Sequence, residues 1–252
     1  MPTLAVLQAR MSSTRLPGKV MRPLLGEPMI GRQIQRIRRA QLIDSLVIAT
    51  STDPADDVLV EYAATLGVPV VRGPLDDVLA RFTSVIEQFQ PDAIVRLTAD
   101  CPLTSPTVID LVIERFLESD VDYCSNTLQA TFPDGLDVEV VRPAALLAVA
   151  SSSADAAEHE HVTLGIYRRP NEFSLANVKG NMDLSHLRWT VDTAEDFAFV
   201  EEIYAALYPS DAHFDMNDVL QLLEARPALV RTSADEVRNA ALIGLDTGAM
   251  HA

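Results

Sequence analysis

The sequence predicts an α/β fold with a mostly parallel central sheet flanked by helices. Short apolar runs that have the character of buried strands alternate with segments whose apolar residues recur at helical spacing. The length of 252 residues fits one domain of this class, and hydrophobic residues, at 48%, supply a core. Because the ligands of such sheets bind at the carboxyl ends of the strands, the loops that follow the strands are the places to look for a site.

The first half of the chain has the more regular pattern. Ile30, Ile34 and Ile37 recur at helical spacing, and Gly67 stands where a later helix should end. The expected strands cover residues 4–8, 45–50, 69–72 and 93–98, and the expected helices cover residues 29–39, 56–66, 77–88 and 107–117. In the second half we expect strands over 138–141 and 188–190 and helices over 143–150, 154–167, 194–207 and 217–225.

The charge of the chain is unevenly distributed. The net charge is -16, yet the first 40 residues hold eight Lys or Arg and a single acid, Glu27. A chain this acidic should repel nucleic acid, so the basic start indicates a small anionic ligand. Four of the eight cations lie in the first predicted helix, and we interpret them as a solvated helix face: Arg32, Arg36, Arg38 and Arg39.

Composition also bears on the compartment. No apolar run approaches the roughly 18 residues that a membrane helix needs, so we expect no membrane partner. We see no secretory signal, and two cysteines, Cys101 and Cys124, cannot form a disulfide framework or a four-ligand zinc site. We therefore expect a cytoplasmic protein.

The loop after the first strand is the most informative stretch. Arg10, Arg15 and Lys19 lie within ten residues of one another, among hydroxyl side chains and a Pro-Gly turn. Arginine forks and a lysine point charge suit a triphosphate. The loop is not a Walker A motif, because Ser13 replaces the first glycine and Val20 follows the lysine.

Residues 8–30, with Arg15-Leu16-Pro17-Gly18-Lys19, resemble the opening signature of sugar nucleotidyltransferases. The resemblance is strongest to the cytidylyltransferases that activate acidic sugars, the CMP-acylneuraminate and CMP-3-deoxy-manno-octulosonate synthetases, and within them to the spore-coat-polysaccharide F-type branch. Segments that support it cover residues 72–79, 96–103, 134–140, 160–163 and 188–196. The resemblance implies a glycosyltransferase-A-like nucleotide-diphospho-sugar transferase fold. The supporting segments run to about residue 208. We expect one domain over 1–241, with a nucleotide-binding half (1–120) and a substrate and dimer half (121–241), followed by a tail (242–252) of small, mixed residues.

The resemblance assigns roles to individual residues. Asp100 and Asp192 would hold Mg²⁺, although Ala99 departs from the usual glycine before the first aspartate, and Thr193 with Asp196 could simply cap a helix. Arg10, Arg15 and Lys19 would be the catalytic cations. The expected nucleotide-binding residues are Gln8, Ala9, Arg10, Ser12, Ser13, Arg15, Lys19, Arg72 and Asp77; Asp76 and Asp77 could equally cap a helix.

Candidate substrate residues are Asp137, Glu139 and His161. On a strand, positions 137 and 139 point to the same face, so both acids could line a sugar site or lie on a solvated face. By resemblance His161 contacts the acceptor, and a helix-capping role is equally open. His159 and His161 do not form a zincin motif, because residues 159–163 lack its spacing.

Together these features predict a Mg²⁺-dependent cytidylyltransferase that transfers CMP from CTP to a sugar or sugar acid and releases pyrophosphate. Its partners would be CTP and the acceptor, with a second copy of the chain if residues 133–141 and the helix near 160 form a homodimer. Two alternatives stay open. One is a glycosyltransferase of the same fold that uses Asp137 and Glu139 as a metal pair, and the other is a module that binds a nucleotide or sugar without turnover.

Overall fold

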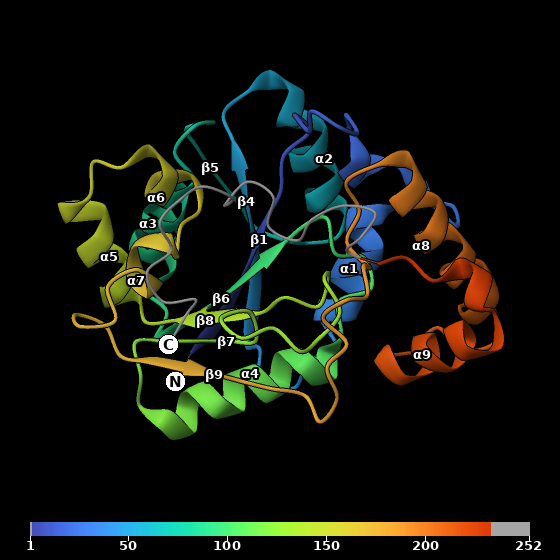
Figure 1. Ribbon diagram of the computed structural model, residues 1–252. Coiled ribbons are helices and arrows are strands. Elements are labelled where there is room, and N and C mark those ends of the chain that lie inside the picture. Colours follow the sequence, from blue (N-terminus) through green and yellow to red (C-terminus); the bar gives the residue numbers. More distant parts are fainter. Residues whose placement is uncertain (1, 233–252) are drawn as a thin grey trace.

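A seven-stranded sheet forms the centre of the computed structural model, which describes residues 2–232 (Figure 1). The order across the sheet is β5-β4-β1-β6-β8-β7-β9. The strands are β1 Thr3–Gln8, β4 Ser45–Ser51, β5 Val70–Gly73, β6 Ala93–Thr98, β7 Tyr123–Ser125, β8 Glu139–Val141 and β9 Leu175–Asn177. A separate small hairpin joins β2 Pro23–Leu24 to β3 Glu27–Pro28.

The sheet is mostly parallel, as predicted. β1 pairs in parallel with β4 and β6, β4 with β5, and β7 with β9, whereas β8 runs antiparallel to both β6 and β7. From β1 the chain adds β4 and β5 on one side and then returns to place β6 on the other. The strand order therefore reverses between β1 and β6, and a crevice for a ligand is expected beyond their carboxyl ends.

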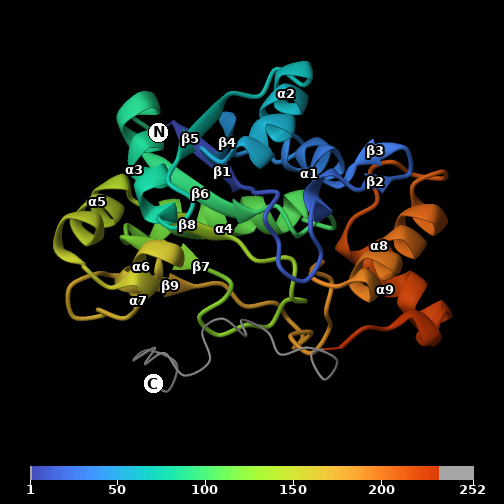
Figure 2. The same ribbon diagram turned by 90° about the horizontal axis from the view of Figure 1, so that it is seen from above.

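Alternating side chains of the strands build a core on each face of the sheet. In β1, Ala5 and Leu7 join one core, whereas Leu4 and Val6 join the other. The first core is covered by α1 Met29–Ile37, α2 Asp57–Thr65, α4 Pro106–Ser119, α8 Ala194–Leu207 and α9 Met216–Ala225. The second is covered by α3 Val78–Phe89, α5 Pro143–Ser152 and α7 Leu164–Tyr167. The short α6 Ala156–Glu160 packs beside α3, and all four helices cluster on the other side in Figures 1 and 2.

Local signals at the helix ends are confirmed. Gly67 follows α2 with a φ of +62°, a conformation that glycine adopts without the penalty of a Cβ. Asp77 is the N-cap of α3 and accepts a hydrogen bond of 2.8 Å from the Ala80 amide. Thr193 and Asp196 form a reciprocal capping box at the start of α8.

The second half differs from its predictions in two places. The helix expected over 154–167 is two short helices, α6 and α7, because the chain turns at Val162, whose φ is +51°. The strand expected over 188–190 is not one; Arg188 makes only an isolated bridge to Asp134. Strands β7 and β9 were not predicted, since three residues are too few to show a period.

The arginines of α1 do not form the solvated face that we predicted. Arg32 and Arg36 are buried, with 8% and 3% of their surface exposed. Arg32 donates to the Leu24 carbonyl and Arg36 to the Thr104 carbonyl. Arg38 fits the prediction, because it is exposed and donates to the carbonyl of Leu66.

Both halves of the chain contribute strands to one sheet, and the predicted boundary at 241 and the tail 242–252 lie outside the described residues. Residues 138–141 are buried within the molecule, β8 lying between β6 and β7, so they offer no surface to a second copy. Within residues 2–232, none of the helices combines the length and the apolar character that crossing a membrane requires.

Candidate active site

The candidate active site lies beyond the carboxyl ends of β1 and β6, where the strand order reverses. The loop 9–18 leaves β1 and the loop 99–105 leaves β6. A third segment, 189–193, comes from the second half and meets them there. The amide of Val191 donates to the carbonyl of Asp100 at 2.8 Å, which joins residues that are 91 positions apart.

The loop after β1 is anchored by a buried carboxylate that the sequence analysis did not single out. Asp56 accepts hydrogen bonds from the Met11 amide at 2.7 Å and the Thr50 hydroxyl at 2.8 Å, and also from Ser51. Burial acts to raise the pKa of Asp56, but the hydrogen bonds from Ser51 and Met11 outweigh it and lower the pKa. Asp56 therefore stays charged and fixes the start of the loop on β4.

Lys19 follows the loop and points into the crevice. Gly18, with a φ of +70°, turns the chain directly before it. The ammonium nitrogen Nζ of Lys19 lies 3.2 Å from Asp100 Oδ2, 3.0 Å from Asp192 Oδ1 and 2.7 Å from the carbonyl oxygen of Val191. One cation thus joins the two aspartates that were predicted as metal ligands, although they are 92 residues apart in the sequence.

Asp192 is held in place from behind by a buried arginine. Arg188, 2% exposed, contacts Asp192 Oδ2 at 3.0 Å, Asp196 Oδ2 at 2.9 Å and Asp134 Oδ2 at 3.3 Å. Gly135 packs against the same segment so closely that an added Cβ would lie 2.6 Å from the Thr190 nitrogen. Residues 134–135 and 188–196, both quoted for the resemblance, therefore meet to position one carboxylate.

Electrostatics keep both partners of the central contact charged. Burial acts to raise the pKa of Asp100, but the Lys19 ammonium and hydrogen bonds from Thr98 and Lys19 outweigh it and hold the pKa at about 2. Burial likewise acts to lower the pKa of Lys19, and the charges of Asp100 and Asp192 raise it overall. The site is therefore a preformed cluster of one ammonium and two carboxylates.

The other predicted phosphate ligands are divided between two places. Arg15 contacts Asp192 Oδ2 at 3.0 Å and joins the cluster with its side chain 45% exposed. Arg10 instead faces α6, where it lies 3.5 Å from Glu160 Oε1. Ser12 is exposed, and the Ser13 hydroxyl accepts from the Leu16 amide within the loop. Ala9 is buried, and its amide bonds the carbonyl of Ala49.

A second polar cluster lies on the β8 side of β1 and includes an arginine that the analysis missed. Arg96 donates to Gln8 Oε1 at 3.2 Å and forms an ion pair with Glu139. Glu139 also accepts from the Tyr123 hydroxyl at 2.6 Å and from the Thr163 hydroxyl at 2.5 Å. Its carboxylate is therefore fully engaged within the protein.

The remaining candidate substrate residues lie around these clusters. Asp137 precedes β8 and is not on the strand, so the expected alternation with Glu139 does not hold. Its charge, after that of Asp100, contributes to raising the pKa of Cys101, which burial raises most. His161 is the C-cap of α6, and burial followed by the charge of Arg96 lowers its pKa. His161 thus has the capping position and also lies within reach of the Arg96 charge.

Two predicted nucleotide ligands have structural partners. Arg72 donates to the carbonyls of Ser51 and Asp53 and forms an ion pair of 2.6 Å with Asp57, so it holds the loop after β4. Asp77 caps α3 and also lies 2.8 Å from Nδ1 of His159. Contact of either residue with a nucleotide stays a prediction.

Two of the residues that were missed, Arg96 and Arg188, could have been found from the sequence by one signal. Arg96 lies within the apolar run of β6, and Arg188 precedes a tryptophan in a motif with three acids. A charged residue in such a position is buried only with partners. Asp56 gives no comparable signal, because it stands in a turn among other polar residues.

The carboxylate pair suits a divalent cation. Asp100 and Asp192 offer hard oxygen ligands, and the Lys19 ammonium already lies between them, at a point where positive charge is stabilised. Among the residues that the structure describes, no group of three or more His, Cys, Asp or Glu side chains is arranged to hold a metal. A cation at this pair would need further oxygens, which nucleotide phosphates and water supply.

Comparisons of the sequence and of the fold with known proteins agree with one another on a family. A family model described as cytidylyltransferase matches residues 4–233. The spore coat polysaccharide biosynthesis protein SpsF of Bacillus subtilis is 35% identical over 208 residues, which cover 80% of this chain and 85% of that protein. The 3-deoxy-manno-octulosonate cytidylyltransferase of Chlorobium phaeovibrioides is 33% identical over 53% of each chain. The structure of a cytidylyltransferase from Leptospira borgpetersenii superposes with a TM-score of 0.87 at 28% identity, covering 91% of this chain and 97% of that one.

Proposed function

We propose a specific reaction for this chain, which belongs to the cytidylyltransferase family. It transfers CMP from CTP to a sugar or sugar acid and releases pyrophosphate, as a step in the biosynthesis of a surface polysaccharide. We place the reaction in the cytoplasm; the two buried free cysteines are compatible with a reducing compartment.

The observation that carries this proposal is the contact of Lys19 with Asp100 and Asp192 at the switch point of the sheet. A transfer at the α-phosphorus of CTP needs cations at the outer phosphates and carboxylates for a metal ion. The cluster contains both, and only a few ångströms separate them. Four carbons link the ammonium of Lys19 to its backbone, so it can turn from the carboxylates to phosphate oxygens without movement of the loop.

In the proposed reaction an acceptor oxygen attacks the α-phosphorus in line, and the bond to the β-phosphate oxygen breaks. Lys19 and Arg15 bind the β- and γ-phosphates and stabilise the departing pyrophosphate. Arg10 approaches them from the α6 side. A Mg²⁺ ion held by Asp100 and Asp192 would neutralise charge on the phosphates. The chain therefore contributes positioning and electrostatic stabilisation and forms no covalent intermediate.

The β8 side of the crevice is our candidate for the acceptor. Gln8, Arg96 and His161 lie there, and their polar groups would suit the oxygens of a sugar acid. A homodimer stays part of the proposal, but its surface must differ from residues 138–141, which are buried.

The glycosyltransferase alternative is less well supported. It needs Asp137 and Glu139 as a metal pair, yet Glu139 is engaged by Arg96, Tyr123 and Thr163. Freeing that carboxylate would leave the Arg96 charge buried without its partner, which is costly. The alternative of a binding module without turnover is decided by experiment.

The test is pyrophosphate release from CTP with Mg²⁺ and a panel of sugars and sugar acids, with UTP and GTP in parallel. We expect release with CTP and at least one acceptor. CTP binding without release under any acceptor would favour the binding module, and release with UTP or GTP in preference to CTP would contradict the assignment of the base.

A further inference from the structure

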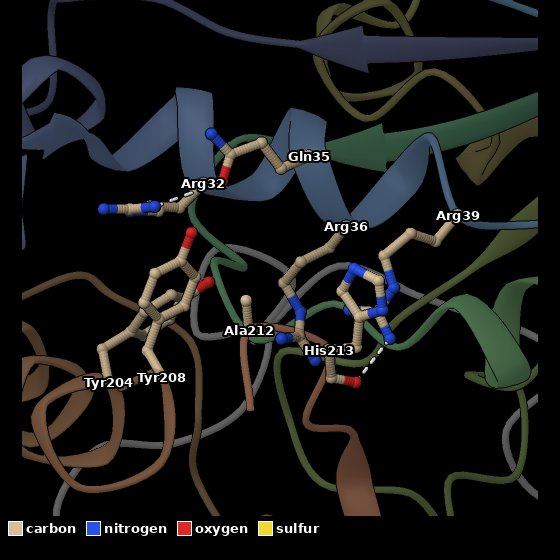
Figure 3. Close-up of a pocket in the computed structure, with 8 residues that line it drawn as sticks. All are labelled: Arg32, Gln35, Arg36, Arg39, Tyr204, Tyr208, Ala212 and His213. Carbon is tan, nitrogen blue, oxygen red and sulfur yellow. Dashed lines mark hydrogen bonds between the residues drawn. The ribbon is translucent and has the colours of Figure 1, made fainter. Parts of the chain in front are cut away.

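A second region rich in cations lies on the other side of α1, away from Lys19. It is a pocket of about 260 Å³ between α1, α8 and the segment that leads into α9 (Figure 3). The residues that line it are Arg32, Gln35, Arg36, Arg39, Tyr204, Tyr208, Ala212 and His213. Three guanidinium groups, two from α1 and one from the residues just after it, therefore line one hollow, and the proposed cytidylyl transfer uses none of them.

Arg36 is the most unusual of the three. It is 3% exposed, and neither Nη1 nor Nη2 makes a hydrogen bond with any residue that the structure describes. Its Nε donates to the Thr104 carbonyl at 2.7 Å, and its guanidinium lies over the ring of Phe214. The nearest carboxylate is Asp215, 3.6 Å from Nη2. Burial lowers the pKa of Arg36, although the nearby Tyr204 hydroxyl and then Asp215 act to raise it.

Of the two neighbouring arginines, Arg39 also has an unsatisfied group within the described residues, whereas all three nitrogens of Arg32 are hydrogen-bonded. Nη2 of Arg39 donates to the His213 carbonyl at 2.6 Å, but its buried Nη1 has no hydrogen-bond partner within residues 2–232. Arg32 bonds the carbonyls of Leu24 and Leu25 and lies over the ring of Tyr208. In Figure 3 the hydroxyls of the two tyrosines lie at the Arg32 end of the pocket and the Arg39 side chain lies at the other.

The charges in this pocket do not balance. Within residues 2–232, Arg36 alone of the three arginines forms an ion pair, and its contact with Asp215 is long at 3.6 Å. A buried guanidinium with open N–H groups is costly unless an anion satisfies it, and its fork matches phosphate or carboxylate oxygens. The excess of two positive charges corresponds to a doubly charged anion.

We propose that this pocket binds a small dianion with phosphate-like oxygens, at a site separate from the CTP site. The Nη groups of Arg36 and Nη1 of Arg39 donate to it, and the rings of Tyr204 and Tyr208 form a wall. A free orthophosphate ion and the phosphate group of a small metabolite share this chemistry.

The pocket lies next to the loop 99–105, so its side chains also support that loop. Side chains that line the pocket or lie next to it donate hydrogen bonds to this loop, which carries Asp100. Arg36 bonds the Thr104 carbonyl, the Tyr204 hydroxyl bonds the Pro102 carbonyl at 2.8 Å, and the adjacent Gln33 bonds the Thr98 carbonyl and the Thr104 hydroxyl. A bound anion would therefore contact side chains that support the metal-binding loop.

The test measures equilibrium binding of inorganic phosphate to the full chain without CTP. Because phosphate could also enter the CTP site, binding is compared in the wild type and in Lys19→Met. We expect the Lys19→Met protein to retain the site, and Arg36→Met and Arg39→Gln to weaken it by about tenfold or more. Arg38→Gln, which changes the exposed arginine that caps the C-terminus of α1, is the matched control and should bind as the wild type does.

Several outcomes would overturn the proposal: no phosphate binding, loss of all binding in Lys19→Met, or unchanged affinity in Arg39→Gln. Arg39 is only half-buried, so its variant is expected to fold even if Arg36→Met does not. Weaker binding of a small phosphomonoester than of orthophosphate would identify the free ion as the ligand, and the reverse would identify a metabolite. Because CTP is absent, failure of the proposed transfer reaction would not change these outcomes.

Discussion

Two clusters of basic residues lie within the same fold, and they differ in how far their positive charges are paired with carboxylates. At the sheet edge, Lys19 is matched by Asp100 and Asp192, and Arg188 behind it is matched by three acids. In the pocket beside α1, Arg36 alone of three arginines has an ion pair within residues 2–232, the long contact with Asp215. The comparison indicates that the first cluster is complete before a ligand binds, whereas the second is completed by an anion.

The largest effect should come from removing Arg188, the arginine that is paired with acids behind Lys19, and it should appear in stability. Arg188→Met would remove the buried partner that Asp134 and Asp196 share and leave Asp196 with Arg231, so we expect a loss of about 3 kcal/mol in the free energy of unfolding. Urea denaturation monitored by the single tryptophan, Trp189, measures it. A loss below about 1 kcal/mol would show that these acids do not depend on Arg188.

The next largest effect should appear in the rate of reaction. Lys19→Met removes the cation proposed to bind the outer phosphates, and we expect turnover to fall on the order of 10²- to 10³-fold. The chain has one other lysine, the exposed Lys179, so Lys179→Met is a matched control that should keep the wild-type rate. Pyrophosphate release under saturating CTP makes the measurement, and equal rates in the two variants would remove Lys19 from the mechanism.

Acid should lower the stability that the Asp100 charge contributes, and this effect should be smaller than that of removing Arg188. The pKa of Asp100 is about 2 in the folded protein, against an ordinary value of 3.8. A depressed pKa stabilises the fold above the unfolded value, and that contribution is lost as the pH falls from about 4 towards 2. We expect the wild type to lose on the order of 1 kcal/mol more than Asp100→Asn between pH 5 and pH 3.

Equal losses in the two proteins over that range would mean that Lys19 does not hold the Asp100 charge. The comparison with Asp100→Asn guards against a general acid effect, since both proteins carry the same other carboxylates. Asp196, whose pKa is also about 2, contributes equally to both and cancels.

The smallest effect is expected in the unmatched pocket. Without phosphate, Arg39→Gln removes one of three like charges and one hydrogen bond to the His213 carbonyl, so the free energy of unfolding should stay within about 0.5 kcal/mol of wild type. Thermal unfolding in phosphate-free buffer measures it. A large loss of unfolding free energy would mean that Arg39 is already well paired without an anion. That result would contradict the contrast between the two clusters.

Much of the fold could be predicted because its signals are local. The alternation of strands and helices, the cap at Asp77 and the capping box of Thr193 and Asp196 depend on residues within a few positions of one another. The loop of Arg15 and Lys19, and Asp100 after its strand, could be placed at the sheet edge because parallel strands end there together. The short strands β7 and β9 and the break at Val162 escaped, since three residues carry too little pattern.

Only the tertiary structure decided which distant residues meet. The sequence by itself determined the α/β class, the order of the motifs and the acidic and basic residues available. It did not determine that Val191 bonds the Asp100 carbonyl, which brings Asp192 to Lys19, or that Arg32 and Arg36 are buried. The physical reason is that burial depends on what packs against a helix, and the helices α8 and α9 that cover α1 begin more than 150 residues later.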